Sequence, residues 1–207
     1  MTEYKTVLTD SSGEITEKKS RFIGTLHHVE NEDEAVDFIN EMKKKYWDAR
    51  HNCSAFVAGF DDYAERANDD GEPSRTAGMP ILETIKNMGL HNVCMVVTRY
   101  FGGILLGTGG LTRAYRDAAT AAIESAEIIT MRKLNRATVS VDYDAYGKLR
   151  YEAEKRGFRM INSSFGQLVS LEYALSGEEA AFLGQYISEI TNGLRTLEIL
   201  EPDWFQV

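Results

Sequence analysis

The residues with the clearest chemical potential form a glycine-rich segment that joins a β-branched run to an amphipathic stretch. The β-branched run ends at Arg99, and after it the segment contains Gly102, Gly103, Gly107, Thr108, Gly109 and Gly110. A strand, a glycine turn and a helix in this order point backbone N–H groups at an anion. The segment is not a P-loop, because Thr108 stands where that motif needs a lysine, and its glycines do not have the GxGxxG spacing.

Arginines flank this segment, and we predict that they complete an anion site. Arg99 precedes the glycines, Arg113 and Arg116 follow them, and no acidic residue lies between residues 87 and 116. A helix beginning near Gly110 would hold Arg113 in its first turn and Arg116 on the same face, three residues on. The alternative is structural, with glycines that only permit a tight turn and an Arg113–Asp117 pair at i,i+4 spacing.

A second cluster of chemically capable residues lies in an acidic loop that ends before a predicted helix. It comprises Asp69, Asp70, Glu72, Ser74 and Arg75. Three carboxylates in four positions can hold Mg²⁺ beside a phosphate, although they lack the spacing of an EF-hand. A solvated loop is the simpler interpretation, so no metal or other cofactor is predicted and Mg²⁺ stays a weak alternative. We expect this loop to face the same groove as the glycine turn, because both lie at strand–helix connections.

The remaining candidates do not form a catalytic set. His51 and Cys53 make a His-x-Cys pair without further ligands, which is poor evidence for zinc. Cys53 and Cys94 both lie in apolar runs, as buried free thiols do. Because no GxSxG, HExxH or kinase motif is present either, the sequence favours a binding protein and predicts no catalytic residue.

Composition restricts the possible partners. The 207 residues carry a net charge of −9, divided into −5 up to residue 133 and −4 after it. An acidic chain is repelled by bulk nucleic acid and by anionic membranes, so any nucleic-acid role needs a local basic site. No apolar stretch is long enough to span a bilayer, and the first residues lack a signal-peptide pattern, so we expect a cytoplasmic protein without a membrane partner.

Hydrophobic periodicity and turn residues predict two α+β domains, over residues 1–133 and 134–207. In the first, we expect a turn at residues 11–13, a helix after the Asn31-x-x-Glu34 capping pattern, a loop over 61–73 and a helix capped by Ser74. In the second, we expect a strand through Tyr143 and a helix from Tyr146, in the order β-α-β-β-α-β of a ferredoxin-like fold.

Four segments together resemble the YigZ/IMPACT family, in the form of a bacterial member with an appended C-terminal domain. They read SRFIG, WDARHNCSAFV, NDDGEPSRTAGMP and VVTRYFGGILLGTGGLTRAY, and they lie between residues 20 and 120. Members of that family usually have glycine where Arg75 stands here, and many have lysine where Leu105 stands. These departures add one cation to the acidic loop and remove one from the glycine segment.

The resemblance implies a fold and a function. The first domain should be similar to the second domain of ribosomal protein S5, and the second to domain V of elongation factor G. Eukaryotic members regulate translation, so we expect a partner that is RNA, the ribosome or a translation-linked protein, bound through the glycine turn. Two alternatives remain open: a nucleotide-binding or phosphoryl-transfer enzyme similar to GHMP kinases, and a module that binds only proteins.

Overall fold

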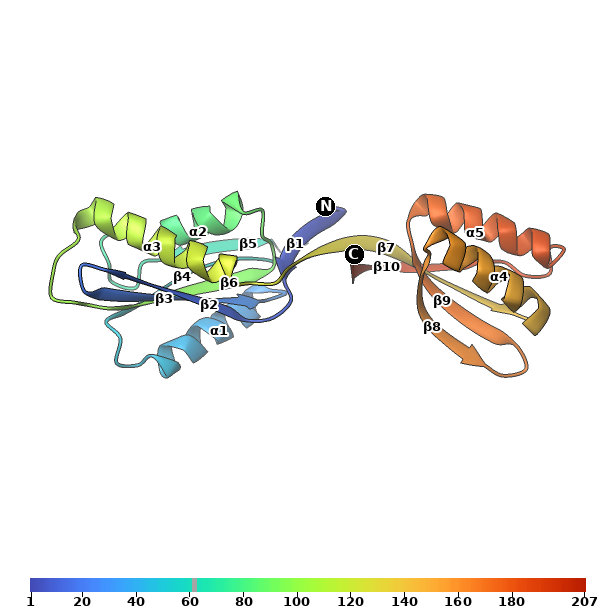
Figure 1. Cartoon of the computed structure of the whole chain (residues 1–207), viewed down its shortest axis with the longest axis horizontal. Helices are drawn as coiled ribbons and strands as arrows, with labels where there is room; N and C mark the ends of the chain where they lie inside the picture. Colours follow the sequence, from blue (N-terminus) through green and yellow to red (C-terminus); the bar gives the residue numbers. More distant parts are fainter. Residues whose placement is uncertain (61–62) are drawn as a thin grey trace. The chain divides into compact units, whose positions relative to one another are not determined.

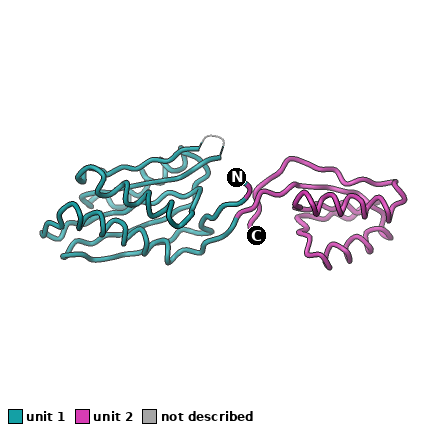
Figure 2. The backbone as a smooth tube through the Cα atoms, turned by 90° about the horizontal axis from the view of Figure 1, so that it is seen from above, with its two compact units in different colours: residues 1, 3–130 teal, residues 2, 131–207 magenta. Residues whose placement is uncertain are grey.

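The computed structural model describes residues 1–60 and 63–207, so Asp61 and Asp62 of the predicted loop lie outside it. The described chain forms two compact units, one of residues 1 and 3–130 and the other of residues 2 and 131–207 (Figure 2). The division falls inside a strand, three residues before the predicted boundary between residues 133 and 134. The α+β class predicted from the sequence is confirmed.

The first unit is built on an antiparallel sheet with helices on both faces. The sheet order is β2 (Ser11–Glu17), β3 (Ser20–His28), β6 (Val93–Tyr100), β4 (His51–Ala58) and β5 (Ala64–Asn68). Helices α2 (Gly78–Asn87) and α3 (Gly107–Glu124) cover one face, and α1 (Glu32–Lys45) covers the other (Figure 1). Each face of the sheet has its own apolar core, because successive side chains along a strand point to opposite faces.

Close packing of α3 on the sheet depends on small residues. Buried alanines at 114, 118, 119 and 122 face the strands. At Gly24 in β3, a Cβ atom would lie 2.6 Å from the Ala118 carbonyl oxygen, so no larger residue fits there. The alanine-rich stripe of the sequence therefore marks a helix that lies directly on the sheet.

The second unit has the predicted ferredoxin-like order. Its elements are β7 (Ile128–Val141), α4 (Tyr143–Arg156), β8 (Arg159–Phe165), β9 (Val169–Leu175), α5 (Gly177–Ile190) and β10 (Glu198–Gln206). Strand β7 pairs with both β10 and β9, and β9 pairs with β8. Strand β1 (Glu3–Val7) precedes these elements in the chain and belongs to the first unit. The core of this unit comes from the two helices and the inward residues of β7 and β9.

Most helix starts predicted from local capping residues are confirmed. Asn31 accepts a hydrogen bond from the Glu34 backbone, and Ser176 and Glu179 form a complete capping box. Strand β7 ends at Val141, and Asp142 caps α4, so the predictions of a strand through Tyr143 and a helix start at Tyr146 were wrong. In the described part of the chain, no helix is both long and apolar enough to cross a membrane.

Two predictions about the first unit were also wrong. Residues 11–13 belong to β2, and the chain turns instead at Lys18 and Lys19, whose φ angles are 44° and 66°. The stretch predicted as loop contains β5, which pairs with β4 from Ala64 to Asn68. Antiparallel pairing with the preceding strand β4 decided that segment, and the local turn residues did not reveal it.

Asp69 caps α2, a role that the sequence suggested for Ser74. Its Oδ1 accepts hydrogen bonds from the N–H groups of Ala77 and Gly78, both at 2.9 Å, and its Oδ2 accepts one from Arg75 N–H at 2.7 Å. Ser74 is exposed. A carboxylate eight residues upstream can reach the helix start because the chain between them forms a tight loop.

We expect Asp69→Ala to lower the free energy of unfolding by about 2 kcal/mol, because helix caps contribute 0.5–2 kcal/mol and this one satisfies three N–H groups. The matched variant Ser74→Ala should change it by less than about 0.5 kcal/mol. Urea unfolding followed by circular dichroism measures both. Equal losses in the two variants would contradict the assignment.

We expect residues 131–207 to fold when expressed alone, because their apolar core lies entirely between Ala137 and Ile187. A fragment starting at residue 134 should be less stable, since residues 131–133 pair with Trp204, Phe205 and Gln206 of β10. Amide NMR dispersion and thermal unfolding compare the two fragments. A disordered spectrum for residues 131–207 would show that the unit needs the rest of the chain.

Candidate functional site

The glycine-rich segment lines a pocket of about 350 Å³ in the first unit. Its walls come from the start of β4, the loop after β5, the end of β6 and the start of α3. The lining residues are Arg50, His51, Gly71, Glu72, Pro73, Arg99, Phe101, Leu105, Leu106, Gly107, Thr108 and Leu111. Antiparallel pairing of His51 with Arg99 brings the start of β4 beside the end of β6.

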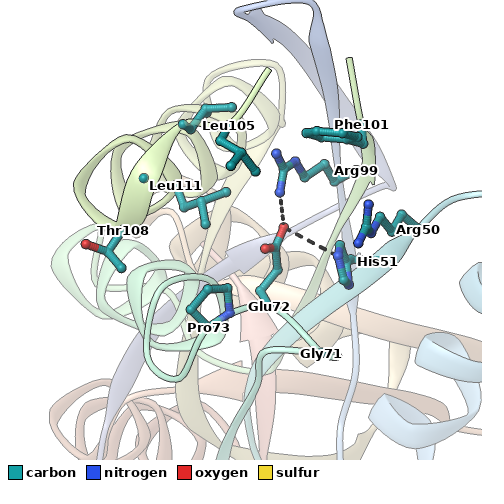
Figure 3. A pocket seen from close by; sticks show the side chains of 12 residues that line it. Arg50, His51, Gly71, Glu72, Pro73, Arg99, Phe101, Leu105, Thr108 and Leu111 are labelled. Atoms are coloured by element: carbon teal, nitrogen blue, oxygen red, sulfur yellow. Dashed lines mark hydrogen bonds and ion pairs between the residues drawn. The ribbon is translucent and has the colours of Figure 1, made fainter. Parts of the chain in front are cut away.

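A buried ion pair forms the floor of the pocket (Figure 3). Arg99 Nη1 donates to Glu72 Oε1 at 2.5 Å, and the two side chains are only 5% and 4% exposed. Arg99 Nη2 also lies 3.5 Å from Ser20 Oγ, which in turn accepts the Gly102 N–H. The pair therefore connects the acidic loop to β6, to β3 and to the glycine segment.

Tyr115 also forms a hydrogen bond with the carboxylate of Glu72. Its hydroxyl donates to Glu72 Oε1 at 2.9 Å and accepts from Cys53 Sγ at 3.3 Å. Burial raises the pKa values of Tyr115 and of the Cys53 thiol well above their ordinary ranges, and nearby Glu72 adds to both shifts. Both groups therefore stay protonated, so Cys53 is a hydrogen-bond donor in this network and not a thiolate nucleophile.

His51 lies beside Glu72 with a defined orientation. Its Nδ1 lies 2.8 Å from the carbonyl oxygen of Asp70, which can only accept, so Nδ1 carries a proton. Its Nε2 lies 3.9 Å from Glu72 Oε1, which is longer than a hydrogen bond. The ring is thus fixed by the loop backbone, and its second nitrogen faces the carboxylate.

The start of α3 provides N–H groups without a side-chain cap. The helix begins at Gly107, three residues before the predicted start near Gly110, and Leu106 at its N-cap position makes no capping hydrogen bond. The first turn therefore contains Gly107, Thr108, Gly109 and Gly110, none of them acidic. The exposed partial positive charge of the helix dipole lies at this end, beside the pocket.

Position 102 requires a glycine because another backbone segment lies very close to it. A Cβ atom there would lie 2.0 Å from the backbone carbon of Lys19, in the turn between β2 and β3. Gly103 follows it in the loop with φ 84°. These two glycines shape the loop that leads from β6 to α3, and neither lines the pocket.

The predicted convergence of three arginines does not occur. Arg99 is buried against Glu72, whereas Arg116 forms an exposed ion pair with Glu83 of α2 at 3.6 Å. Because α3 starts at Gly107, Arg113 lies in its second turn, and it is exposed. Neither Arg113 nor Arg116 lines the pocket, and the alternative Arg113–Asp117 pair is not formed in the part of the chain that the structure describes.

The cation that sequence reasoning missed is Arg50. It is exposed, lies 5.4 Å from the Phe101 ring centre and forms no ion pair with any described residue. For its neighbour His51, the sequence offers only poor evidence of a zinc ligand. Both belong to the segment WDARHNCSAFV that carries the family resemblance, which was the only signal pointing to them.

The acidic loop divides into structural and pocket residues. Asp69 caps α2, and Asp70 accepts from the Asn52 N–H at 2.7 Å and pairs with Lys43 at 2.9 Å. Desolvation raises the pKa of Asp70, but the Asn52 N–H and Lys43 outweigh it, so the pKa falls below its ordinary value. Of the three carboxylates only Glu72 reaches the groove of the glycine segment, so the expectation that all three face it was wrong.

Metal binding by this loop finds little support in the geometry. The carboxylate oxygens of Asp69 and Asp70 are used by N–H groups and Lys43. Within residues 1–60 and 63–207, no three His, Cys, Asp or Glu side chains are grouped to hold a metal ion. Arg75 has φ 63°, a conformation that favours glycine, and the family's usual glycine at this position has the same physical basis.

Comparison with known proteins covers both units. Residues 18–123 match the Impact N-terminal domain, and residues 139–194 match a domain of unknown function, DUF1949. The IMPACT family member YvyE of Bacillus subtilis is 40% identical over 92% of this chain and 88% of its own length. The IMPACT family member YigZ of Escherichia coli is 35% identical over 89% of this chain and 91% of its own length.

A solved structure is similar to this chain in fold. It is described as the crystal structure of a hypothetical protein, and it matches with a TM-score of 0.64 and 30% identity over 97% of this chain and 98% of its own. The similarity therefore extends over both units, in sequence and in fold. On these matches, the chain belongs to the IMPACT family.

Proposed function

We propose that this protein is a translation-associated regulatory protein whose first unit binds phosphate groups of RNA at the start of α3. The observation that carries the proposal is the juxtaposition of Arg50 with the uncapped N-terminus of α3 at one pocket. Both features are positive; among the described residues, Arg50 has no ion-pair partner and the start of α3 has no side-chain cap. In a chain of net charge −9, such a local site is what a nucleic-acid role requires.

The charges of the pocket support an anion at its rim. Arg99 is neutralised by Glu72, so Arg50 and the helix dipole remain as the positive contributions. N–H groups at a helix start bind phosphate through hydrogen bonds and through the dipole. The sequence prediction that the glycine turn binds an anion thus keeps its physical basis, with Arg50 in place of Arg113 and Arg116.

The link to translation rests on family membership. The resemblance implies that eukaryotic members regulate translation, and the partner proposed here is RNA, alone or as part of the ribosome. A phosphoryl-transfer enzyme is less well supported, because two of its three candidate Mg²⁺ ligands already bond to N–H groups of the backbone. A module that binds only proteins would need no phosphate site, so phosphate binding separates it from this proposal.

We expect Arg50→Ala to weaken binding of a 5′-phosphorylated hexaribonucleotide about five- to tenfold at low salt, because one charged hydrogen bond is lost. The slope of log affinity against log salt should fall by about one. Arg150→Ala, in the second unit, is the matched control for net charge, and Arg113→Ala tests whether the sequence-predicted arginines take part. Isothermal titration calorimetry measures all four proteins.

A gain of binding is also expected at Leu105. This side chain is 83% exposed and lines the pocket, so Leu105→Lys adds a cation there without disturbing the core. Affinity for the same oligonucleotide should rise about threefold or more at low salt. Unchanged affinity in both Arg50→Ala and Leu105→Lys would contradict the proposed site, and a wild-type protein that binds neither the oligonucleotide nor inorganic phosphate would contradict the proposed function.

A further inference from the structure

Glu72 has one carboxylate oxygen that accepts no hydrogen bond from the described residues. Arg99 and Tyr115 both donate to Oε1, and no described residue donates to Oε2. Among the described residues, Arg99 Nε is the one fully buried side-chain nitrogen or oxygen without a hydrogen-bond partner. Glu72 Oε2 is therefore not sealed off, and the opening beside it is the pocket that Glu72 lines.

This free oxygen gives the pocket two chemically different ends. The rim, formed by Arg50 and the start of α3, donates hydrogen bonds, whereas the floor at Glu72 accepts them. A phosphate at the floor would be repelled by the carboxylate, so an anion has to lie at the rim. A group that donates to Glu72 has to be a hydroxyl or an amine, held a short distance from the anion.

His51 lies beside the floor of the pocket. Its Nδ1 lies 2.8 Å from the carbonyl oxygen of Asp70, which fixes the ring so that Nε2 faces Glu72. The Nε2 atom lies 3.9 Å from Glu72 Oε1, which is too far for a direct hydrogen bond, so the ring does not occupy the carboxylate. Glu72 therefore stays available to a hydroxyl of a ligand.

The remaining wall is apolar. Phe101, which is 37% exposed, lies beside Arg50, and Leu105, Leu106 and Leu111 come from the loop and helix opposite. Figure 3 shows Phe101 and Arg50 on one side of the pocket and Thr108 and Leu111 on the other. Aromatic rings next to arginine are the surfaces on which bases stack, and a volume of about 350 Å³ is that of a small-molecule site.

We infer that the pocket binds one ribonucleotide, with its phosphate at the start of α3 and a ribose hydroxyl donating to Glu72 Oε2. An acidic side chain that accepts from a ribose hydroxyl is the device by which dinucleotide folds recognise their ligands. The 2′-hydroxyl is also the group by which a protein distinguishes RNA from DNA. The inference rests on the proposed phosphate binding and deepens it, because it assigns selectivity for ribose to the same site.

The test compares ligands on the wild-type protein. The four ribonucleoside 5′-monophosphates and their 2′-deoxy counterparts are titrated by calorimetry. We expect the ribonucleotides to bind at least about tenfold more tightly, because the deoxy ligand leaves a buried carboxylate oxygen without its donor. Equal affinities overturn the ribose inference while phosphate binding stands, and no binding by either set, or by inorganic phosphate, overturns the proposed function itself.

A second arm identifies the source of the ribonucleotide. A 5′-phosphorylated hexaribonucleotide is compared with its deoxy counterpart and with the mononucleotides. Preference for the hexaribonucleotide supports an RNA end as the ligand. Binding of ribonucleoside monophosphates alone supports ribose recognition but contradicts the RNA part of the proposed function.

Variants then locate the selectivity. In Glu72→Gln, the ratio of ribonucleotide to deoxynucleotide affinity should fall toward one, whereas Arg50→Ala should weaken both ligands equally and leave the ratio unchanged. Thermal unfolding checks that each variant is folded. A folded Glu72→Gln protein with the wild-type ratio overturns the inference, and if this variant does not fold, the wild-type comparison still decides.

Discussion

The buried ion pair between Glu72 and Arg99 is the interaction on which the first unit's site depends. Two charges that are 4% and 5% exposed receive little stabilisation from water, so each depends on the other. Removing one partner of such a pair typically costs about 3–5 kcal/mol, because the remaining charge is left buried. The pair fixes the acidic loop against the end of β6, and Tyr115 connects it to α3. The pocket floor is therefore set by the same contacts that hold these elements together.

This constraint also separates the roles of neighbouring acidic residues. Asp69 and Asp70 are used to hold the loop, one at the start of α2 and the other at the backbone of β4. Their hydrogen bonds place Glu72 beside the end of β6, where its Oε1 accepts from Arg99 and its Oε2 accepts from no residue that the structure describes. Three similar carboxylates within four positions thus have three different functions, decided by which donors the fold brings to each.

The sequence predicted what local signals determine. The cap at Asn31, the capping box at Ser176 and the order of elements after residue 134 were correct, because they depend on residues a few positions apart. The cap of α2 comes from a carboxylate eight residues upstream, and β5 forms by pairing with the preceding strand β4. The composition of the pocket depends on distant partners. Arg50 meets the glycine segment only because β4 pairs with β6, with His51 opposite Arg99. No spacing along the chain contains that information, so Arg113 and Arg116 were predicted in its place.

The two departures from the family pattern have different physical meanings. Arg75 occupies a left-handed conformation with φ 63° outside the pocket, so the usual glycine there relates to backbone strain and not to ligand binding. Leu105 lines the pocket, so the lysine that many members have would strengthen the positive rim. In this chain the rim depends on Arg50 and the helix start, while the acceptor at Glu72 is unaltered. On the proposed function, the missing cation at position 105 weakens the attraction for phosphate, whereas the hydroxyl acceptor at Glu72 is unchanged. The contact with the sugar would then contribute a larger share of the binding energy.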